Sequence, residues 1–169
     1  MHNEAAPARV PPPSFSMNSD LLDAALALIA SAPGYEAVAA DLSRLRERGR
    51  IRFVPDLADR AHAGLLGALT LGPEAFEEDS ALGLAETLVH EHHHLFRQPP
   101  LLKTVSFWAG VATRTPTMAR YERPAYDAAL GFLRAVARTR SDLADEAARE
   151  ASAVEATFAA NYTTAGAKK

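Results

Sequence analysis

The sequence predicts one mostly helical α+β domain with a small β-sheet. The chain has 169 residues, 48% of them hydrophobic, and a formal net charge of -3, values typical of a globular domain with one core. Helical spacing of apolar residues dominates, and only two short segments favour strands. We expect a proline-rich flexible arm at 1–17, the domain at 18–162 and a flexible tail at 163–169.

The first half of the domain is expected to combine two helices with two strands. Helices are predicted over 21–31, which ends before Pro33-Gly34, and over 36–48, which Gly49 closes. Charged and apolar residues alternate at 50–54, and glycines flank the apolar stretch 65–71, so both segments predict short strands.

The segment after Asp79-Ser80 predicts an amphipathic helix with the pattern H-E-x-x-H at 90–94. Asp79-Ser80 is suited to cap the N-terminus of this helix. In a helical projection most leucines lie on one face, whereas His90, Glu91 and His94 lie on the other. The pattern therefore falls on a helix with a polar face, as a metal site in a cleft requires.

The spacing of this pattern predicts a metal site with a general base. Residues i and i+4 differ by about 40° of rotation, so His90 and His94 project side by side and can bind one ion. Glu91 lies at the edge of the same face, where its carboxylate can accept a proton from a metal-activated water. A structural or adventitious histidine cluster is the alternative. We expect His92 to be a core residue and His93 to be an outer-sphere or substrate-facing group.

Two histidines leave a catalytic zinc site one protein ligand short. No histidine follows His94, so a downstream ligand must be a carboxylate, and the segment 120–127 holds the candidates. Asp127 is one of them. Glu86, one helical turn before His90, could be an outer-sphere carboxylate or a solvated one.

At 120–127 the chain resembles the gluzincin group of zinc metallopeptidases. In that group H-E-x-x-H precedes a second helix with the pattern E-x-x-A, which Glu122-Arg123-Pro124-Ala125 matches. The resemblance covers the middle third to half of the chain. It implies a zincin-like fold, with zinc held by His90, His94 and Glu122.

The resemblance also implies further roles in the cleft. Tyr126 shares a helix face with Glu122 and would stabilise the oxyanion of the reaction, although a half-buried interface tyrosine is the alternative. The strand at 65–71 would form the sheet edge to which a peptide adds, unless it is an internal strand. Because Pro124 favours the first turn of a helix, we expect Glu122 at or just before a helix N-terminus.

The remaining segments complete a helical scaffold. Helices are predicted at 101–111, 125–138 and 141–160, with a linker at 113–118. We expect Trp108, in the first of these helices, to lie in the core.

The expected function is zinc-dependent hydrolysis of peptide bonds, with Glu91 as the general base. A non-haem iron peptide-modifying oxygenase and a catalytically silent zincin-like binding module are the alternatives. The partner is a peptide or protein substrate. Neither nucleic acid nor membrane is expected, because the basic stretch 44–50 suits a solvated helix end and the apolar run 21–30 is too short to span a bilayer. Without a secretion signal the cytoplasm is the default location.

Overall fold

The computed structural model describes residues 15–64, 66–77, 80–98, 100–113 and 116–162. Within these ranges the chain forms six α-helices, two 3-10 helices and a three-stranded sheet, which confirms a mostly helical α+β fold. None of the described helices combines the length and apolar character needed to cross a membrane. The predicted tail and most of the predicted arm lie outside the described residues.

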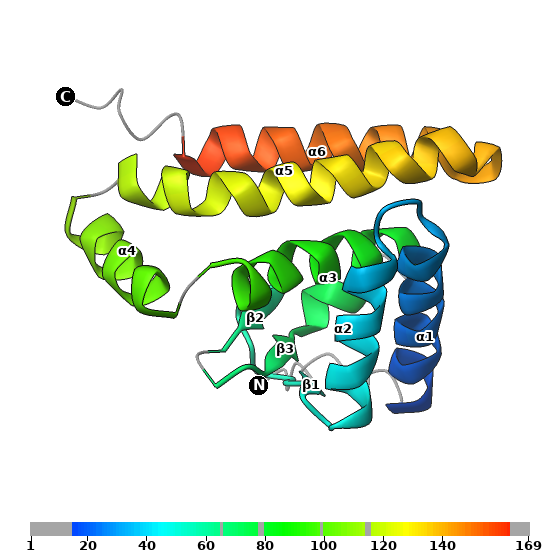
Figure 1. Cartoon of the computed structure of the whole chain (residues 1–169), viewed down its shortest axis with the longest axis horizontal. Helices are drawn as coiled ribbons and strands as arrows, with labels where there is room; N and C mark the ends of the chain where they lie inside the picture. The colour runs from blue at the N-terminus through cyan, green and yellow to red at the C-terminus, as the bar shows by residue number, and fades with distance from the viewer. Residues whose placement is uncertain (1–14, 65, 78–79, 99, 114–115, 163–169) are drawn as a thin grey trace, which may run out of the picture.

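Helices α1 (Phe15–Ser31) and α2 (Glu36–Glu47) form an antiparallel pair (Figure 1). α1 begins before the predicted start and takes in the last three residues of the predicted arm. α2 ends at Glu47, one residue before the predicted end, and Gly49 closes it as predicted, with a φ of 63° that favours glycine. The N–H groups of Gly49 and Arg50 donate to Arg46 and Leu45 at 2.9 and 2.8 Å, and these bonds satisfy the last carbonyls of the helix.

The sheet consists of β1 (Ile51–Phe53), β2 (Ala61–Ala63) and β3 (Leu69–Leu71) in the order β1-β3-β2. β1 is parallel to β3 and β2 is antiparallel to it. The strand predicted at 50–54 is confirmed. The strand predicted at 65–71 is shorter, and its placement at the sheet edge is wrong, because β3 is central.

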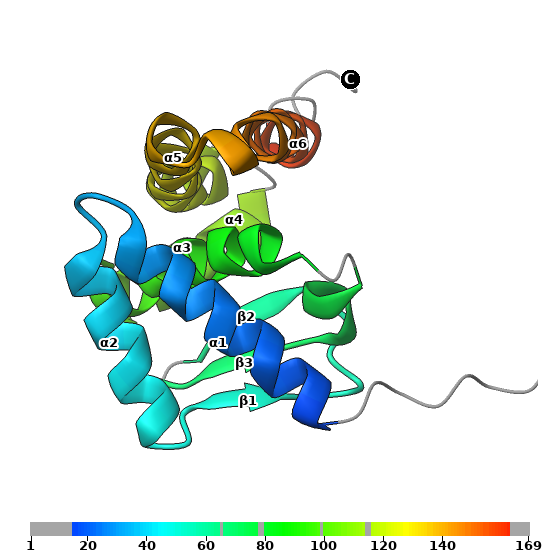
Figure 2. The same ribbon diagram turned by 90° about the vertical axis from the view of Figure 1, so that its right-hand side faces the viewer.

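Helix α3 (Ala81–Phe96) carries the predicted metal-binding pattern and lies between the sheet and the α5–α6 hairpin (Figures 1 and 2). A 3-10 helix at Pro73–Phe76 precedes it. The Oγ of Ser80 accepts a hydrogen bond from the N–H of Gly83 at 3.1 Å, which confirms the serine part of the predicted cap. Residues 82–89 are all buried. The helix is therefore held from several sides, and this fixes the direction of its polar side chains.

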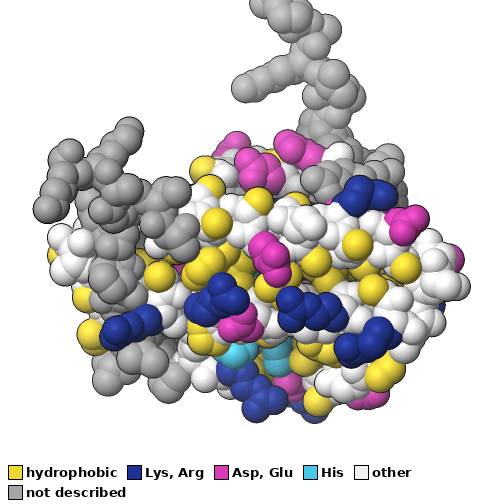
Figure 3. Space-filling model, turned by 90° about the horizontal axis from the view of Figure 1, so that it is seen from above, with side chains coloured by type: hydrophobic (Ala, Val, Ile, Leu, Met, Phe, Trp, Pro, Cys, Tyr) yellow, Lys and Arg dark blue, Asp and Glu magenta, His cyan; other side chains and the backbone are white. Residues whose placement is uncertain are grey.

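Three further helices follow: α4 (Pro100–Thr113), α5 (Pro116–Thr139) and α6 (Ala144–Tyr162), with a 3-10 helix at Ser141–Leu143 before α6. α5 packs against α3, α4 and α6. On the outer side of the α5–α6 hairpin, arginine side chains lie in a loose row with acidic side chains beside them (Figure 3).

The prediction that a helix begins near Ala125 is wrong, because α5 starts at Pro116 and contains Pro124 in its interior. Proline lacks the N–H that would bond to the carbonyl of Arg120, at a cost of about 3 kcal/mol. Both residues are exposed, so water can satisfy that carbonyl. Packing of α5 against its three neighbours offsets the rest of the cost, and Glu122 consequently lies inside the helix.

Replacement of Pro124 by alanine should therefore raise the free energy of unfolding by roughly 1–3 kcal/mol, because the missing backbone hydrogen bond can then form. Urea denaturation followed by circular dichroism measures the change. Pro116→Ala, at the first residue of the same helix, is the matched control and should change it by less than about 0.5 kcal/mol. Destabilisation by Pro124→Ala would mean that the packing of α5 requires the proline.

Candidate metal centre

His90, His94 and Glu122 bring three potential ligand atoms together between α3 and α5. The Nε2 atom of His94 lies 3.1 Å from Nε2 of His90 and 3.1 Å from Oε2 of Glu122. The third side of the triangle, from Nε2 of His90 to Oε2 of Glu122, measures 3.4 Å. The structure thus brings together the three residues predicted as ligands.

The size of this triangle fits a divalent metal. Zinc–nitrogen and zinc–oxygen bonds of about 2.0–2.1 Å in a tetrahedron place neighbouring ligand atoms about 3.3 Å apart. The three observed separations of 3.1, 3.1 and 3.4 Å are close to that value. Neutral imidazole nitrogens and a carboxylate all accept rather than donate at these atoms, so a cation between them relieves their mutual repulsion.

Gln98 orients one of the ligands and was not predicted. Its Oε1 accepts a hydrogen bond from Nδ1 of His94, and its Nε2 donates to the backbone carbonyl of Tyr121. With Nδ1 protonated, the lone pair on Nε2 of His94 faces the cluster. Gln98 lies two residues beyond the end of α3, in the bend after the helix, so helical spacing could not have identified it.

The charges around the cluster favour a cation. Burial alone would raise the pKa of Glu122, but the adjacent imidazoles of His90 and His94, which donate to it when they are protonated, outweigh this and lower the pKa to about 2. Burial alone would lower the pKa of His90, yet the bond to Glu122 and nearby carboxylates raise it. Both shifts show that positive charge is stabilised at the centre of the triangle.

Glu91 lies beside the triangle without belonging to it. Its side chain is buried but lines two adjoining hollows of about 240 and 760 Å³ that share Arg60, Ala61, His90 and Tyr126. Together these hollows form the cleft. The larger one falls in the range of small-ligand and peptide sites. Glu91 can thus face a ligand in either half of the cleft while leaving the metal to the three other residues.

The structure separates the other carboxylates from the ligand set. Asp127 is 54% exposed, pairs with Arg123 at 2.9 Å and is not among the residues that meet at the cluster. Glu86 is buried rather than solvated, and it lines the smaller hollow. Burial raises the pKa of Glu86 despite the opposing charges of His90 and Arg60.

The two other histidines of the run lie elsewhere. His92 is 3% exposed, and its Nε2 lies 2.9 Å from Oδ2 of Asp41 on α2, which confirms it as a core histidine with a hydrogen-bond partner. His93 is half-buried and does not line the cleft, so the structure does not bring it to the metal centre.

Two tyrosines border the cluster. The ring of Tyr126 meets the ring of His90 edge-on at 4.8 Å, and its hydroxyl is hydrogen-bonded with the side chain of Asn161. Tyr121, which was not predicted, stacks on His94 at 4.9 Å, and its buried hydroxyl has no hydrogen-bond partner among the residues that the structure describes. Both line the cleft. The catalytic role of Tyr126 stays a prediction.

Trp108 is not a core residue, contrary to the prediction. It is 64% exposed and lines the larger hollow together with Tyr121 and Tyr162. The physical reason is the position of α4, which packs mainly against α5 and leaves its opposite side uncovered among the described residues. Trp108 therefore forms part of a cleft wall.

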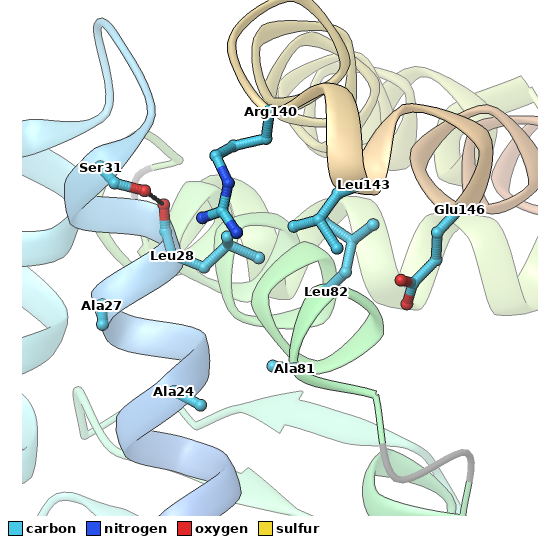
Figure 4. Close-up of a pocket in the computed structure, with 9 residues that line it drawn as sticks. All are labelled: Ala24, Ala27, Leu28, Ser31, Ala81, Leu82, Arg140, Leu143 and Glu146. Carbon is cyan, nitrogen blue, oxygen red and sulfur yellow. Dashed lines mark hydrogen bonds between the residues drawn. The ribbon is translucent and has the colours of Figure 1, made fainter.

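A separate hollow of about 410 Å³ lies between α1, the start of α3 and the turn from α5 to α6 (Figure 4). Its walls are mostly apolar, and its charged groups already have partners. Arg140 binds Asp142, and Glu146 accepts from Ser80 at 2.7 Å. Leu82 in its wall precedes His90 by about 12 Å along the helix axis. This hollow is therefore not part of the metal centre.

Comparison of the chain with protein-family models, curated proteins and solved structures found no match.

Replacement of Glu122 by alanine should weaken zinc binding at least tenfold, because it removes one of three ligand atoms. Isothermal titration of zinc into the purified protein measures the change. Asp127→Ala, one helical turn further along α5, is the matched control and should leave the affinity nearly unchanged. A larger loss from Asp127→Ala than from Glu122→Ala would contradict the ligand assignment.

Gln98→Met should weaken zinc binding by about 10–100-fold, since His94 would lose the hydrogen bond that fixes its ring. The same titration applies, with circular dichroism to verify the fold. Arg97→Ala changes the neighbouring exposed residue and should have no such effect. Equal affinities of Gln98→Met and the unaltered protein would show that packing alone orients His94.

Proposed function

We propose that the chain is a zincin-like metallopeptidase that hydrolyses peptide bonds with zinc held by His90, His94 and Glu122. One observation carries the proposal. Three ligand atoms form a triangle of metal-binding size, and a fourth group, Glu91, faces the same cleft but stands outside the triangle. That division into ligands and a separate base is what hydrolysis by an activated water requires. The resemblance to gluzincins in both patterns points the same way.

Bound zinc would polarise the scissile carbonyl and lower the pKa of a water molecule. The protein's own residues perform the remaining steps. Glu91 accepts the proton of the attacking water and passes it to the leaving amine, so its carboxylate begins and ends the cycle unprotonated. Gln98 keeps His94 in the tautomer that binds metal. Tyr126 or Tyr121 can donate a hydrogen bond to the developing oxyanion.

The edge of β2 supports a peptide as the substrate. The carbonyl of Arg60 accepts from the N–H of Gly72 at 2.9 Å, and the N–H of Gly64 donates to Ala68 at 2.7 Å. Because pairing alternates along an antiparallel ladder, the N–H and C=O of Ala61 point away from β3. Ala61 lines the cleft beside His90 and Glu91. An extended peptide can pair with this edge of β2 as an added strand. The peptide would thus add to β2 and not to the strand at 65–71, which the sequence had predicted for this role.

An iron enzyme is the second candidate, because two histidines and one carboxylate also form the ligand set of non-haem iron oxygenases. The presence of Glu91 favours the hydrolase over the oxygenase. The ligand set of an iron oxygenase is complete with two histidines and one carboxylate, and it gives no role to a second carboxylate beside the metal. Metal analysis of protein purified without chelators distinguishes the two.

Replacement of Glu91 by glutamine should lower peptide hydrolysis by about 10²-fold or more and leave zinc affinity unchanged, because the amide keeps its size but cannot take a proton. A mixed peptide library analysed by mass spectrometry, with zinc content measured in parallel, gives both quantities. Asp127→Asn makes the same chemical change on the outer face of α5 and should retain full activity.

Undiminished cleavage by Glu91→Gln would refute Glu91 as the base. If neither protein cleaves the library, addition of iron(II) and 2-oxoglutarate tests the oxygenase alternative. An unmodified library under both conditions would favour a binding module that lacks catalysis.

A further inference from the structure

The two halves of the cleft differ in chemistry. The smaller hollow is bordered by charged and hydroxyl groups, among them Arg60, Glu86 and Glu150. The larger hollow has an apolar wall formed by Trp108, Met118, Tyr121 and Tyr162. Arg60 and Tyr126 line both hollows, and the larger one also contains Asp59 and His62, so the difference between the halves is the apolar wall around Trp108.

Strand β2 fixes which end of a paired peptide meets which half. Within β2, Ala61 lines both hollows, whereas His62 and Ala63 line only the larger one, which Asp59 in the bend before the strand also lines. The strand itself therefore leaves the smaller hollow at Ala61 and continues along the larger. Antiparallel pairing is the slightly more stable arrangement, and a peptide paired in this way runs in the opposite direction. Its N-terminal part would lie in the larger, aromatic hollow and its C-terminal part beside Arg60.

Helix α4 turns one large exposed apolar side chain to the larger hollow. Trp108 is 64% exposed and lines this hollow, whereas Val105 and Val111, which are 60% and 56% exposed on the same helix, do not line it. A flat, rigid indole beside a metal centre gives a large apolar contact at little cost in conformational entropy.

We propose that the substrate is an extended peptide segment that carries a large apolar side chain at one of the two residues before the scissile bond, packed against Trp108. The assignment rests on the proposed hydrolase function and names the class of substrate for the same site. Trp108 then determines specificity without taking part in the chemistry.

Trp108 is the only tryptophan of the chain, so its fluorescence reports directly on occupation of the larger hollow. The binding test uses the zinc-loaded Glu91→Gln protein, which should bind peptides without cleaving them. A capped alanine-based peptide with one phenylalanine should shift the emission to shorter wavelength in a saturable manner, and should bind at least tenfold more tightly than its all-alanine counterpart. Equal affinities for the two peptides would overturn the assignment.

The cleavage test uses the zinc-loaded protein without substitutions and identifies the products by mass spectrometry. Cleavage should fall one or two bonds C-terminal to the phenylalanine, and Trp108→Ala should reduce the phenylalanine-to-alanine ratio of kcat/KM about tenfold or more. Val111→Ala, an exposed position on α4 outside the cleft lining, is the matched control and should preserve the ratio. Cleavage N-terminal to the phenylalanine would overturn the assigned direction.

The two readouts separate this inference from the proposed function. A phenylalanine-dependent fluorescence shift without hydrolysis by any metal-loaded form would support the apolar hollow and overturn the hydrolase. Hydrolysis with equal kcat/KM for the phenylalanine and the all-alanine peptide would support the hydrolase and overturn the role of Trp108.

Discussion

The contact between α3 and α5 at Glu122 is the interaction on which the metal centre depends. A carboxylate that is 13% exposed would normally be costly, because burial favours its neutral form. Here two imidazoles from the neighbouring helix lie 3.1 and 3.4 Å from it. Glu86 and Glu91 are buried nearby, so carboxylates outnumber histidines. The cleft is thus built to hold positive charge, and a divalent cation supplies more of it than one proton.

The sequence was sufficient for the local part of this site. The i, i+4 spacing of His90 and His94 fixes their relation on any helix, and the polar face of the segment indicated the side on which they lie. The core position of His92 followed from the same projection. These predictions held because they depend on helix geometry alone, which needs no knowledge of the neighbouring elements.

The failures all concern relations between elements. Propensity places Pro124 at a helix start, but packing of α5 against three helices outweighs the cost of an interior proline. β2 has only three residues, Ala-His-Ala, and none of them is β-branched, so nothing in the sequence marks it as the edge strand. The exposure of Trp108 depends on how α4 packs against the rest of the domain, which the sequence of α4 alone does not determine. Resemblance to a family selected Glu122 over Asp127, and only the fold shows the physical basis for that choice.

The two halves of α3 differ in the kind of side chain that they bury. Its first half buries Leu82, Leu84 and Leu88 together with Glu86, whereas its second half buries Glu91, His92 and His94, which need polar partners. A cation that binds the folded state and not the unfolded one raises the free energy of unfolding, and it does so more strongly the tighter it binds. Binding of a metal ion at this triangle would be coupled to the packing of α5, because Glu122 of α5 contacts His94 of α3 and Gln98, just after α3, bonds to Tyr121 of α5. A loss of either contact loosens the helix pair and the ligand set together.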